Sequence, residues 1–238
     1  MQLRLAGLLI GGMLFLSAPA HATQAPINVH FRAEGSRSTL VSQRTVTLAD
    51  AAIVKDGDPA HSCPGQSALG ALQAGTGGDW QGSWSEGLGY FVNEIKGERH
   101  SGSSFFSLWV NHKLSSAGLC GANLKPGGDV LLFVDRCVFD QAKNACKNKS
   151  ITPLGIRAPR TARRGTILTV TVVRYTNAGR TKPVAGAAVY ANGKRLKSGT
   201  NARGRLRLRA TKVGRVRFFA TRPGNAKSEV DTTRIRRA

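Results

Sequence analysis

Arginines alternate with apolar residues in two stretches of the last third of the chain. Arg205, Arg207 and Arg209 form the first row, and Arg215 and Arg217 form the second. In a strand this alternation puts the arginines on one face and the apolar residues in the core. Guanidinium groups bind phosphate or carboxylate with two parallel hydrogen bonds. We expect the two strands to pair antiparallel, which would place the two rows side by side as a polyanion-binding surface.

The charge of the whole chain is concentrated in the same region. From residue 151 to residue 238 there are 22 lysines and arginines against only Glu229 and Asp231, so this region carries +20 of the formal net charge of +22. Like charges directly opposite one another destabilise a sheet. The arginine rows are therefore either a solvated, spread surface or a surface for an anionic partner, and both interpretations stay open.

The first 22 residues have the pattern of a secretory signal. Met1–Arg4 contains one basic residue, residues 5–16 are uncharged, and small residues lead to Ala22, after which we expect cleavage, with Ala20 as the other candidate site. The apolar run is too short to span a bilayer, which needs about 20 residues.

The predicted protein is secreted, with no membrane span, and associates with the cell surface. Anionic cell-envelope polymers such as teichoic-acid-like chains or acidic glycans are then its expected partners, and nucleic acid would bind only non-specifically.

The four cysteines are Cys63, Cys120, Cys137 and Cys146. In an exported protein an even number of cysteines predicts disulfides. We favour Cys137 with Cys146, which are close in sequence, and Cys63 with Cys120. A metal site is the alternative, which is disfavoured because the chain has no CxxC and its histidines are scattered.

Sequence motifs for catalysis are not found. There is no HExxH, no GxSxG, no phosphate-binding loop and no dinucleotide-binding glycine pattern. Glu86, Glu94 and Glu98 could supply a carboxylate pair for glycoside chemistry, but nothing in the sequence brings two of them together. We expect no catalytic residue, no metal and no cofactor, and therefore no enzyme.

The first part of the chain reads as a sheet with one short helix. Residues 27–34 and 40–48 alternate as hairpin strands, and residues 105–134 read as strand, turn, loop, turn, strand. Residues 67–74 form the predicted helix, with Ser67 as its cap and Gly75–Gly78 ending it. The predicted fold class is mostly β: a β-grasp-like domain with one short helix over residues 23–149, followed by a β-sandwich.

A family resemblance covers residues 27–137. The motifs that carry it are SALGALQAGTGGDW (67–80), GYFVNEIKGERH (89–100), WVNHK (109–113) and LKPGGDV (124–130). They resemble the small C-terminal domain of transcobalamin and intrinsic factor, and a family of secreted bacterial domains of unknown function. This resemblance implies a β-grasp-like fold.

The same resemblance implies a ligand-binding face. In the vitamin carriers this domain faces a corrinoid, so the ligand candidates here are Trp84, Tyr90, Trp109 and Asn111. The alternative is that these aromatic residues are core. The carriers also hold their ligand against a large helical domain, for which this sequence has no pattern.

Residues 150–238 read as a second, basic domain. Strands are expected at 166–175, 187–191, 203–210 and 215–221, with Asn192-Gly193 as a hairpin turn. Short strands at such spacing are typical of a β-sandwich. Residues 183–224 resemble a bacterial immunoglobulin-like or carboxypeptidase-regulatory-like module, covering about 153–238.

These features predict a secreted, non-enzymatic binding protein. In the leading hypothesis the basic domain binds envelope polyanions and the first domain binds a small, corrinoid-like ligand or a protein. The alternative is a structural or adhesive cell-surface protein without a small-molecule ligand.

Overall fold

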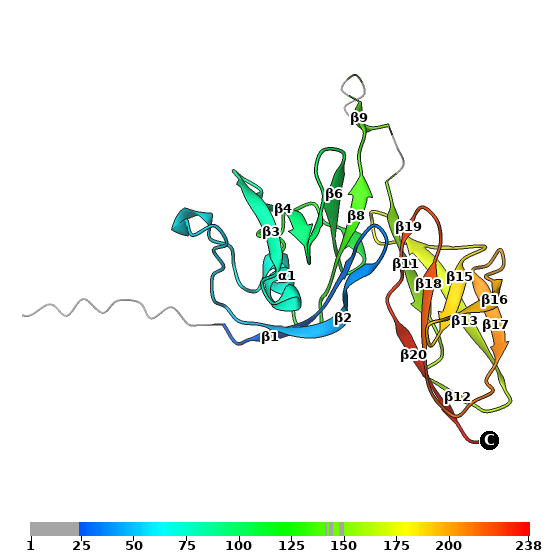
Figure 1. Cartoon of the computed structure of the whole chain (residues 1–238). Coiled ribbons are helices and arrows are strands. Elements are labelled where there is room, and N and C mark those ends of the chain that lie inside the picture. The colour runs from blue at the N-terminus through cyan, green and yellow to red at the C-terminus, as the bar shows by residue number, and fades with distance from the viewer. Residues whose placement is uncertain (1–23, 141, 143–144, 148–149) are drawn as a thin grey trace, which may run out of the picture.

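The computed structural model describes residues 24–140, 142, 145–147 and 150–238, so the predicted signal peptide lies outside the described residues. The described chain is mostly strand, with one α-helix, as predicted. It forms two β-rich units, an N-terminal unit of residues 24–136 and a C-terminal unit of residues 150–238 (Figure 1). Each unit has its own apolar core.

The centre of the N-terminal unit is a five-stranded sheet with the order β2-β1-β8-β6-β7. β1 is antiparallel to β2 and parallel to β8, which makes the sheet mixed, as a β-grasp-like fold requires. Its strands are β1 (Ile27–Glu34), β2 (Thr39–Leu48), β6 (Ser104–Val110), β7 (Lys113–Leu114) and β8 (Asp129–Arg136).

The helix α1 (Ala68–Thr76) packs on β1 and β2. The Ser67 hydroxyl accepts a hydrogen bond from the N–H of Gly70 and caps the helix, as predicted. Gly77, within the predicted stop Gly75–Gly78, ends it in the left-handed conformation, so the helix runs two residues past the expected residue 74. A Cβ on Gly75 would lie 2.1 Å from the Phe31 ring, so this glycine is what allows helix and sheet to approach closely.

A three-stranded sheet completes the N-terminal unit with β3 (Trp80–Ser85), β4 (Gly89–Ile95) and β5 (Glu98–Arg99). The 3-10 helix η1 (Pro59–His61) precedes α1. Cys63 is bonded to Cys120 and Cys137 to Cys146, which is the favoured pairing. The second bridge joins Cys137, directly after β8, to Cys146 in β10 (Ala145–Cys146), which pairs with β9 (Phe139–Asp140).

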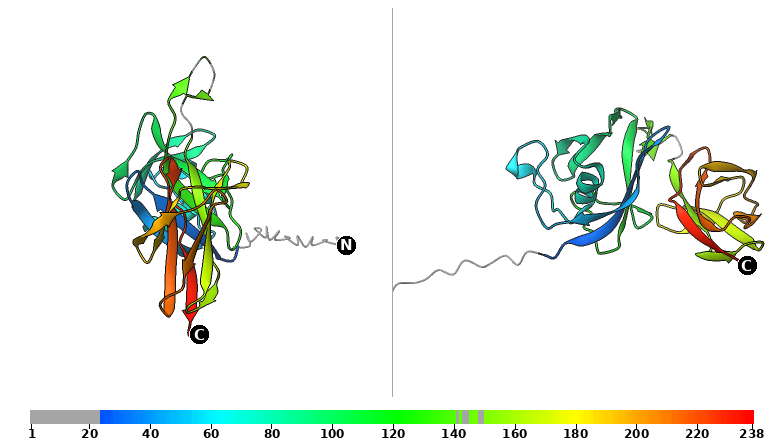
Figure 2. Two further views of the ribbon diagram at one scale, coloured as in Figure 1. Left: turned by 90° about the vertical axis from the view of Figure 1, so that its right-hand side faces the viewer. Right: turned by 60° about the horizontal axis from the view of Figure 1, so that its bottom comes forward.

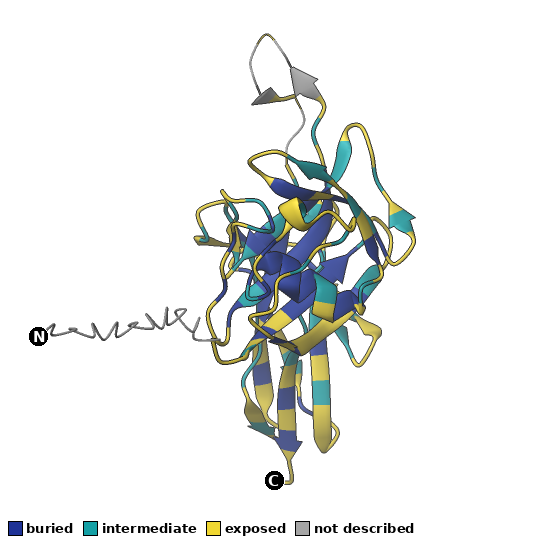
Figure 3. Ribbon diagram, turned by 90° about the vertical axis from the view of Figure 1, so that its left-hand side faces the viewer, coloured by how far each residue is buried: buried dark blue, intermediate teal, exposed yellow. Residues whose placement is uncertain are grey.

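The C-terminal unit is a β-sandwich, as predicted. Two five-stranded sheets enclose a core that includes Leu154, Val170, Phe218 and Ile235. In Figure 3 buried and exposed residues alternate along its strands. The first sheet contains β11 (Thr152–Arg157), β13 (Ile167–Tyr175), β14 (Thr181–Pro183), β17 (Arg205–Arg209) and β19 (Asn225–Ala226). The second contains β12 (Thr161–Arg163), β15 (Ala188–Ala191), β16 (Lys194–Gly199), β18 (Gly214–Thr221) and β20 (Asp231–Arg236).

The expected pairing of the two arginine strands is wrong. β17 pairs with β13 in the first sheet, whereas β18 pairs with β15 and β20 in the second. The chain therefore crosses from one sheet of the sandwich to the other between Arg209 and Arg215. The two predicted rows lie in different sheets rather than side by side.

The two units share an apolar interface. Trp109, Leu131 and Phe133 lie on the face of the central sheet that points away from α1, and they pack against Tyr175 and Ala226 of the C-terminal unit. The interface is also hydrogen-bonded, because Nη1 of Arg32 donates to the carbonyl of Lys227 at 2.7 Å and Nζ of Lys227 donates to Oγ1 of Thr39 at 2.9 Å. The right-hand view of Figure 2 shows the two units lying side by side.

Trp109 is therefore expected to act as a core residue of this interface. Its side chain is 2% exposed, so replacement by alanine should lower the free energy of unfolding by about 3–5 kcal/mol. Denaturant titration of the full chain measures this change. Phe91→Ala is the control, because Phe91 is 50% exposed and its loss should cost less than about 1 kcal/mol. A Trp109→Ala protein as stable as the wild type would contradict the assignment.

Candidate functional site

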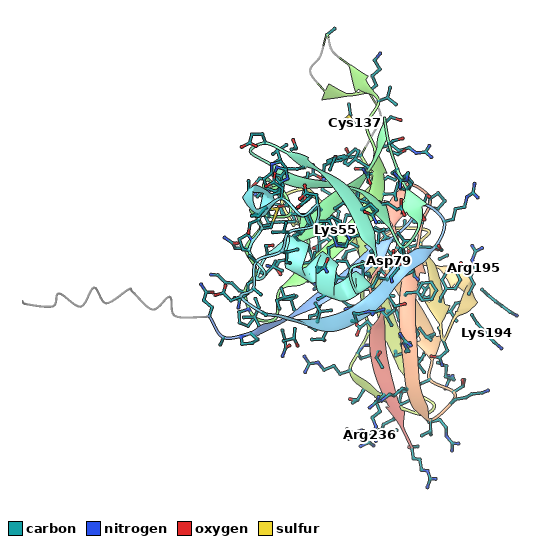
Figure 4. The ribbon with its side chains drawn as sticks, turned by 60° about the vertical axis from the view of Figure 1, so that its left-hand side comes forward. Lys55, Asp79, Cys137, Lys194, Arg195 and Arg236 are labelled. Carbon is teal, nitrogen blue, oxygen red and sulfur yellow. A yellow bond between two sulfur atoms is a disulfide. The ribbon has the colours of Figure 1, made fainter. Side chains whose placement is uncertain are left out.

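Arginines gather on the outer face of the second sheet of the C-terminal unit. Arg215 is paired with Arg234, and Arg163 with Arg236. Directly paired residues, and residues two apart in a strand, point to the same face. Five exposed arginines consequently share this face, which we call the arginine face: Arg163, Arg215, Arg217, Arg234 and Arg236. Figure 4 shows Arg236 at the tip of the unit, near the C-terminus.

Two of these five residues, Arg215 and Arg217, were predicted from the sequence. The other three were missed because β12 and β20 are short and contain little apolar alternation. Arg234 and Arg236 are two residues apart, as in the predicted rows, and this spacing is the signal that could have found them.

The arginine face meets the N-terminal unit at a groove. The groove has a volume of about 290 Å³ and lies between β2 and the strands β18 and β20. Arg217 lines it from the C-terminal unit, and Arg44 lines it from β2. The contact is fixed by a hydrogen bond from the N–H of Val230 to Oε1 of Gln43 at 3.1 Å. The N-terminal unit thus adds a further cation beside the arginine face.

The other predicted row lies on the outer face of the first sheet. Arg205, Arg207 and Arg209 are exposed and are paired with residues 167–171 of β13. Arg157 of β11 pairs with Thr171 and therefore shares this face. Nη1 of Arg209 donates to the carbonyl of Gly165 at 2.7 Å, so one member of this row is already engaged.

Two of the four ligand candidates, Trp84 and Tyr90, line one pocket of the N-terminal unit. This aromatic pocket has a volume of about 420 Å³ and lies between the β3–β4 hairpin, β6 and residues 118–119. All of its lining residues are uncharged. Sequence reasoning missed its other large members, which are Leu88, Phe91, Phe106, Leu108 and Leu119. Leu88 is 65% exposed, so the rim of the pocket is apolar and open to solvent.

Tyr90 has a structural role at the bottom of this pocket. It is buried, and its hydroxyl accepts a hydrogen bond from the N–H of Lys55 at 2.8 Å and donates to Oδ1 of Asp56 at 2.8 Å. Trp84 is half-buried and stacks on His61, with ring centroids 4.4 Å apart. Oδ2 of Asp56 lies 2.6 Å from Nδ1 of His61. Asp56 therefore links both aromatic candidates.

The carboxyl group of Asp56 is held in its charged form. Burial by itself would raise its pKa, but hydrogen bonds with His61, Tyr90 and the backbone of Asp58 lower the pKa below its ordinary value. The charged carboxylate keeps residues 55–61 against the pocket.

The other two candidates, Trp109 and Asn111, lie outside the aromatic pocket. Trp109 is buried between the two units, and its Nε1 donates to Oγ of Ser107 at 3.2 Å. Asn111 is exposed in the β6–β7 turn with a φ of 50°, and its Oδ1 accepts a hydrogen bond from the N–H of Asp129 at 2.9 Å. The WVN motif therefore builds a hairpin and an interface and does not line this pocket.

Among the described residues, no group of three or more histidines, cysteines or acidic residues is arranged to hold a metal ion. No helix within the described part of the chain is long and apolar enough to cross a membrane.

The lowered pKa of Asp56 predicts an acid-dependent loss of stability. A carboxyl group with a lower pKa in the folded state stabilises the fold above the pKa of the unfolded chain, about 3.9, and this contribution disappears as the pH falls through the folded value. The wild type should therefore melt at a higher temperature than Asp56→Asn at pH 7, and the difference should shrink as the pH falls below the unfolded pKa and vanish once the carboxyl group is protonated in the folded protein. Thermal unfolding followed by circular dichroism between pH 2 and pH 7 measures it. A difference that does not change with pH would contradict the role of the charge.

Comparison with known proteins gives structural likenesses, among which two weak ones are to a haptocorrin and to Dscam1. No family model matches the chain, and no curated protein matches it. A haptocorrin solved in complex with Cbi is similar to 49% of this chain at 12% identity, with a TM-score of 0.37. The N-terminal four immunoglobulin domains of Dscam1 are similar to 91% of this chain at 13% identity, with a TM-score of 0.25. This chain covers 27% and 46% of those two chains, and neither likeness places it in a family.

Proposed function

We propose that the protein is a secreted, non-enzymatic binding protein that attaches to anionic polymers of the cell envelope. The observation that carries the proposal is the arginine face, on which five exposed arginines stand in register on three neighbouring strands. None of the five forms an ion pair with a carboxylate of the described residues. The face is therefore a concentrated positive charge without an internal counter-charge.

The two acidic residues of the C-terminal region accept hydrogen bonds from backbone N–H groups instead. Oε1 of Glu229 accepts a hydrogen bond from the N–H of Ile156 at 3.1 Å. The carboxylate of Asp231 accepts hydrogen bonds from the N–H groups of Ala158 and Thr232, at 2.7 and 2.8 Å. Both carboxylates thus bind backbone N–H groups and form no ion pair with the arginine face, whose field remains available to an anionic polymer.

A second function concerns the aromatic pocket of the N-terminal unit. Its uncharged lining and apolar rim support binding of a small, neutral, apolar or flat ligand. Corrinoids and porphyrins belong in a ligand screen because the sequence resembles the vitamin carriers over this region. The competing proposal is an adhesive protein without a small ligand, which is supported by the burial of Tyr90 and Trp109.

The arginine face should dominate binding to anionic polymers. The triple change Arg215→Gln, Arg217→Gln and Arg234→Gln should weaken binding to a polyanion at low salt by at least tenfold, because adjacent guanidinium groups act on one stretch of polymer. It should also make the salt dependence shallower, since fewer counterions are released. Fluorescence anisotropy with a labelled polyanion at low and high salt measures both effects.

The matched control is the triple change Arg205→Gln, Arg207→Gln and Arg209→Gln, which removes the same charge from the opposite face. It should weaken binding less than the first triple change. Equal loss in both proteins would mean that net charge alone drives binding. If neither triple change weakens binding, both groups of arginines are solvated surfaces without a role in polyanion binding.

The aromatic pocket makes a separate prediction. The double change Leu88→Ser and Phe91→Ser removes exposed apolar surface from the rim and should weaken binding of any ligand of this pocket by about tenfold or more. Intrinsic tryptophan fluorescence reports binding because Trp84 lines the pocket. Val213→Ser, an exposed apolar residue of the other unit, is the control. If corrinoids, porphyrins and neutral glycans all leave the fluorescence unchanged, the adhesive alternative gains support.

A further inference from the structure

A pocket lies between the two units at the end of the arginine face. Its volume is about 560 Å³. The β1–β2 turn, residues 35–38, forms one wall, and β15, β18 and β19 form the opposite wall. We call it the inter-unit pocket. Its size is in the range of pockets that bury a small ligand, about 300–1,000 Å³.

The inter-unit pocket continues the arginine face along β18. Arg215, Arg217, Phe219 and Thr221 alternate on the outer side of this strand, because Phe218 and Ala220 point into the core. Successive outer residues are roughly 7 Å apart. Arg217 lines the groove beside β2, and Phe219 and Thr221 line the inter-unit pocket. One polymer chain laid along β18 would thus pass from the arginines directly into this pocket.

Aromatic side chains form the C-terminal wall of the pocket. Tyr190 of β15 is paired with Phe219, and their rings are stacked with centroids 4.5 Å apart. Nζ of Lys227 lies 4.4 Å from the Phe219 ring centre on the same wall. Because Phe219 is in contact with both Tyr190 and Lys227, we expect a ligand to meet the stacked pair and the ammonium group together.

The opposite wall presents polar groups that are held in position. Both the N–H and the hydroxyl of Ser36 donate to Oε1 of Glu98, at 2.7 and 2.6 Å. The N–H of Gly35 also donates to the carbonyl of Ser38 at 2.8 Å. The turn is therefore ordered by its own contacts. The side chains of Arg37 and Ser38 are exposed and make no hydrogen bond to any described residue, which leaves them available to a ligand.

We propose that the inter-unit pocket binds a sugar ring of an acidic glycan whose anionic groups continue along the arginine face. A sugar ring has an apolar C–H face that can pack against the edges of the stacked Tyr190 and Phe219 rings without needing an open ring face, and hydroxyl groups that suit Ser38, Thr221 and Asn225. A carboxylate or sulfate on the ring suits Arg37 and Lys227. This inference rests on the proposed polyanion binding, and it adds which class of polyanion the protein prefers.

A glycan fits this pocket better than a nucleic acid does. Ser38, Thr221 and Asn225 line the pocket with neutral hydrogen-bonding groups, which suit the several hydroxyl groups of a sugar ring better than the charged oxygens of a closely spaced phosphate chain. A nucleobase needs an open aromatic face for stacking. Phe219 stacks on Tyr190 and is covered by Lys227, so it does not offer one without rearrangement.

The test compares three probes on the full chain: a polyuronate oligomer, an inorganic polyphosphate of equal charge, and a single-stranded oligothymidylate. At the same salt concentration the wild type should bind the polyuronate at least tenfold more tightly than the polyphosphate. The double change Tyr190→Ala and Phe219→Ala should remove this preference and leave polyphosphate binding within about twofold. Arg37→Gln, on the exposed turn, should reduce the preference as well and keeps the test usable if the aromatic variant does not fold.

Each other outcome overturns the proposal in a recognisable way. Equal affinity of the wild type for polyuronate and polyphosphate would mean that the pocket selects nothing. A loss of oligothymidylate binding on changing Tyr190 and Phe219, with polyuronate unaffected, would make the pocket a base-stacking site. If the arginine-face triple change leaves all three affinities unchanged, the proposed polyanion binding itself fails. If only the pocket variants have no effect, the proposed function stands and the glycan inference falls.

Discussion

The two-sided burial of β8 determines how the whole molecule is arranged. Residues 130–135 of this strand are all buried. Val130 and Leu132 face α1, and Leu131 and Phe133 point the other way. A strand that is apolar on both faces requires cover on both, and the C-terminal unit supplies the second cover with Tyr175 and Ala226. Moving the units apart would expose this surface together with Trp109, so their relative position follows from the hydrophobic effect.

A buried ion pair at the same interface fixes the relative position of the two units. Nη1 of Arg32 lies 3.0 Å from Oε1 of Glu34, and both side chains are less than 10% exposed. Such pairs add little net stability, but removing their partners leaves a costly buried charge. Arg32 also donates to the carbonyl of Lys227, and Thr39 links Glu34 to the ammonium group of Lys227. The apolar contact alone would allow the two units to slide against each other. The hydrogen bonds of Arg32, Glu34, Thr39 and Lys227 all form in the arrangement that places Lys227 in the inter-unit pocket.

Local patterns predicted the elements but not all their neighbours. The helix cap at Ser67, the strand at 27–34 and the hairpin at Asn192-Gly193 depend on residues close in sequence, and all three are present. Alternation also showed correctly that the arginines of β17 and β18 face outward. It could not show which strands pair, because pairing in a sandwich joins distant segments. For the same reason Trp109 could be assigned to a face of β6, but not to an interface with a unit that begins after residue 149.

The crossing of the chain between the sheets has an electrostatic consequence for the arginine face. With β17 and β18 adjacent, five predicted arginines would have faced one another; in the sandwich the core separates the two rows. Repulsion is still present where Arg215 stands directly opposite Arg234. Neither Glu229 nor Asp231 forms an ion pair with these two arginines, and both carboxylates accept hydrogen bonds from backbone N–H groups instead. A bound anion would relieve this repulsion only in the folded state, so binding and folding are thermodynamically linked on this face.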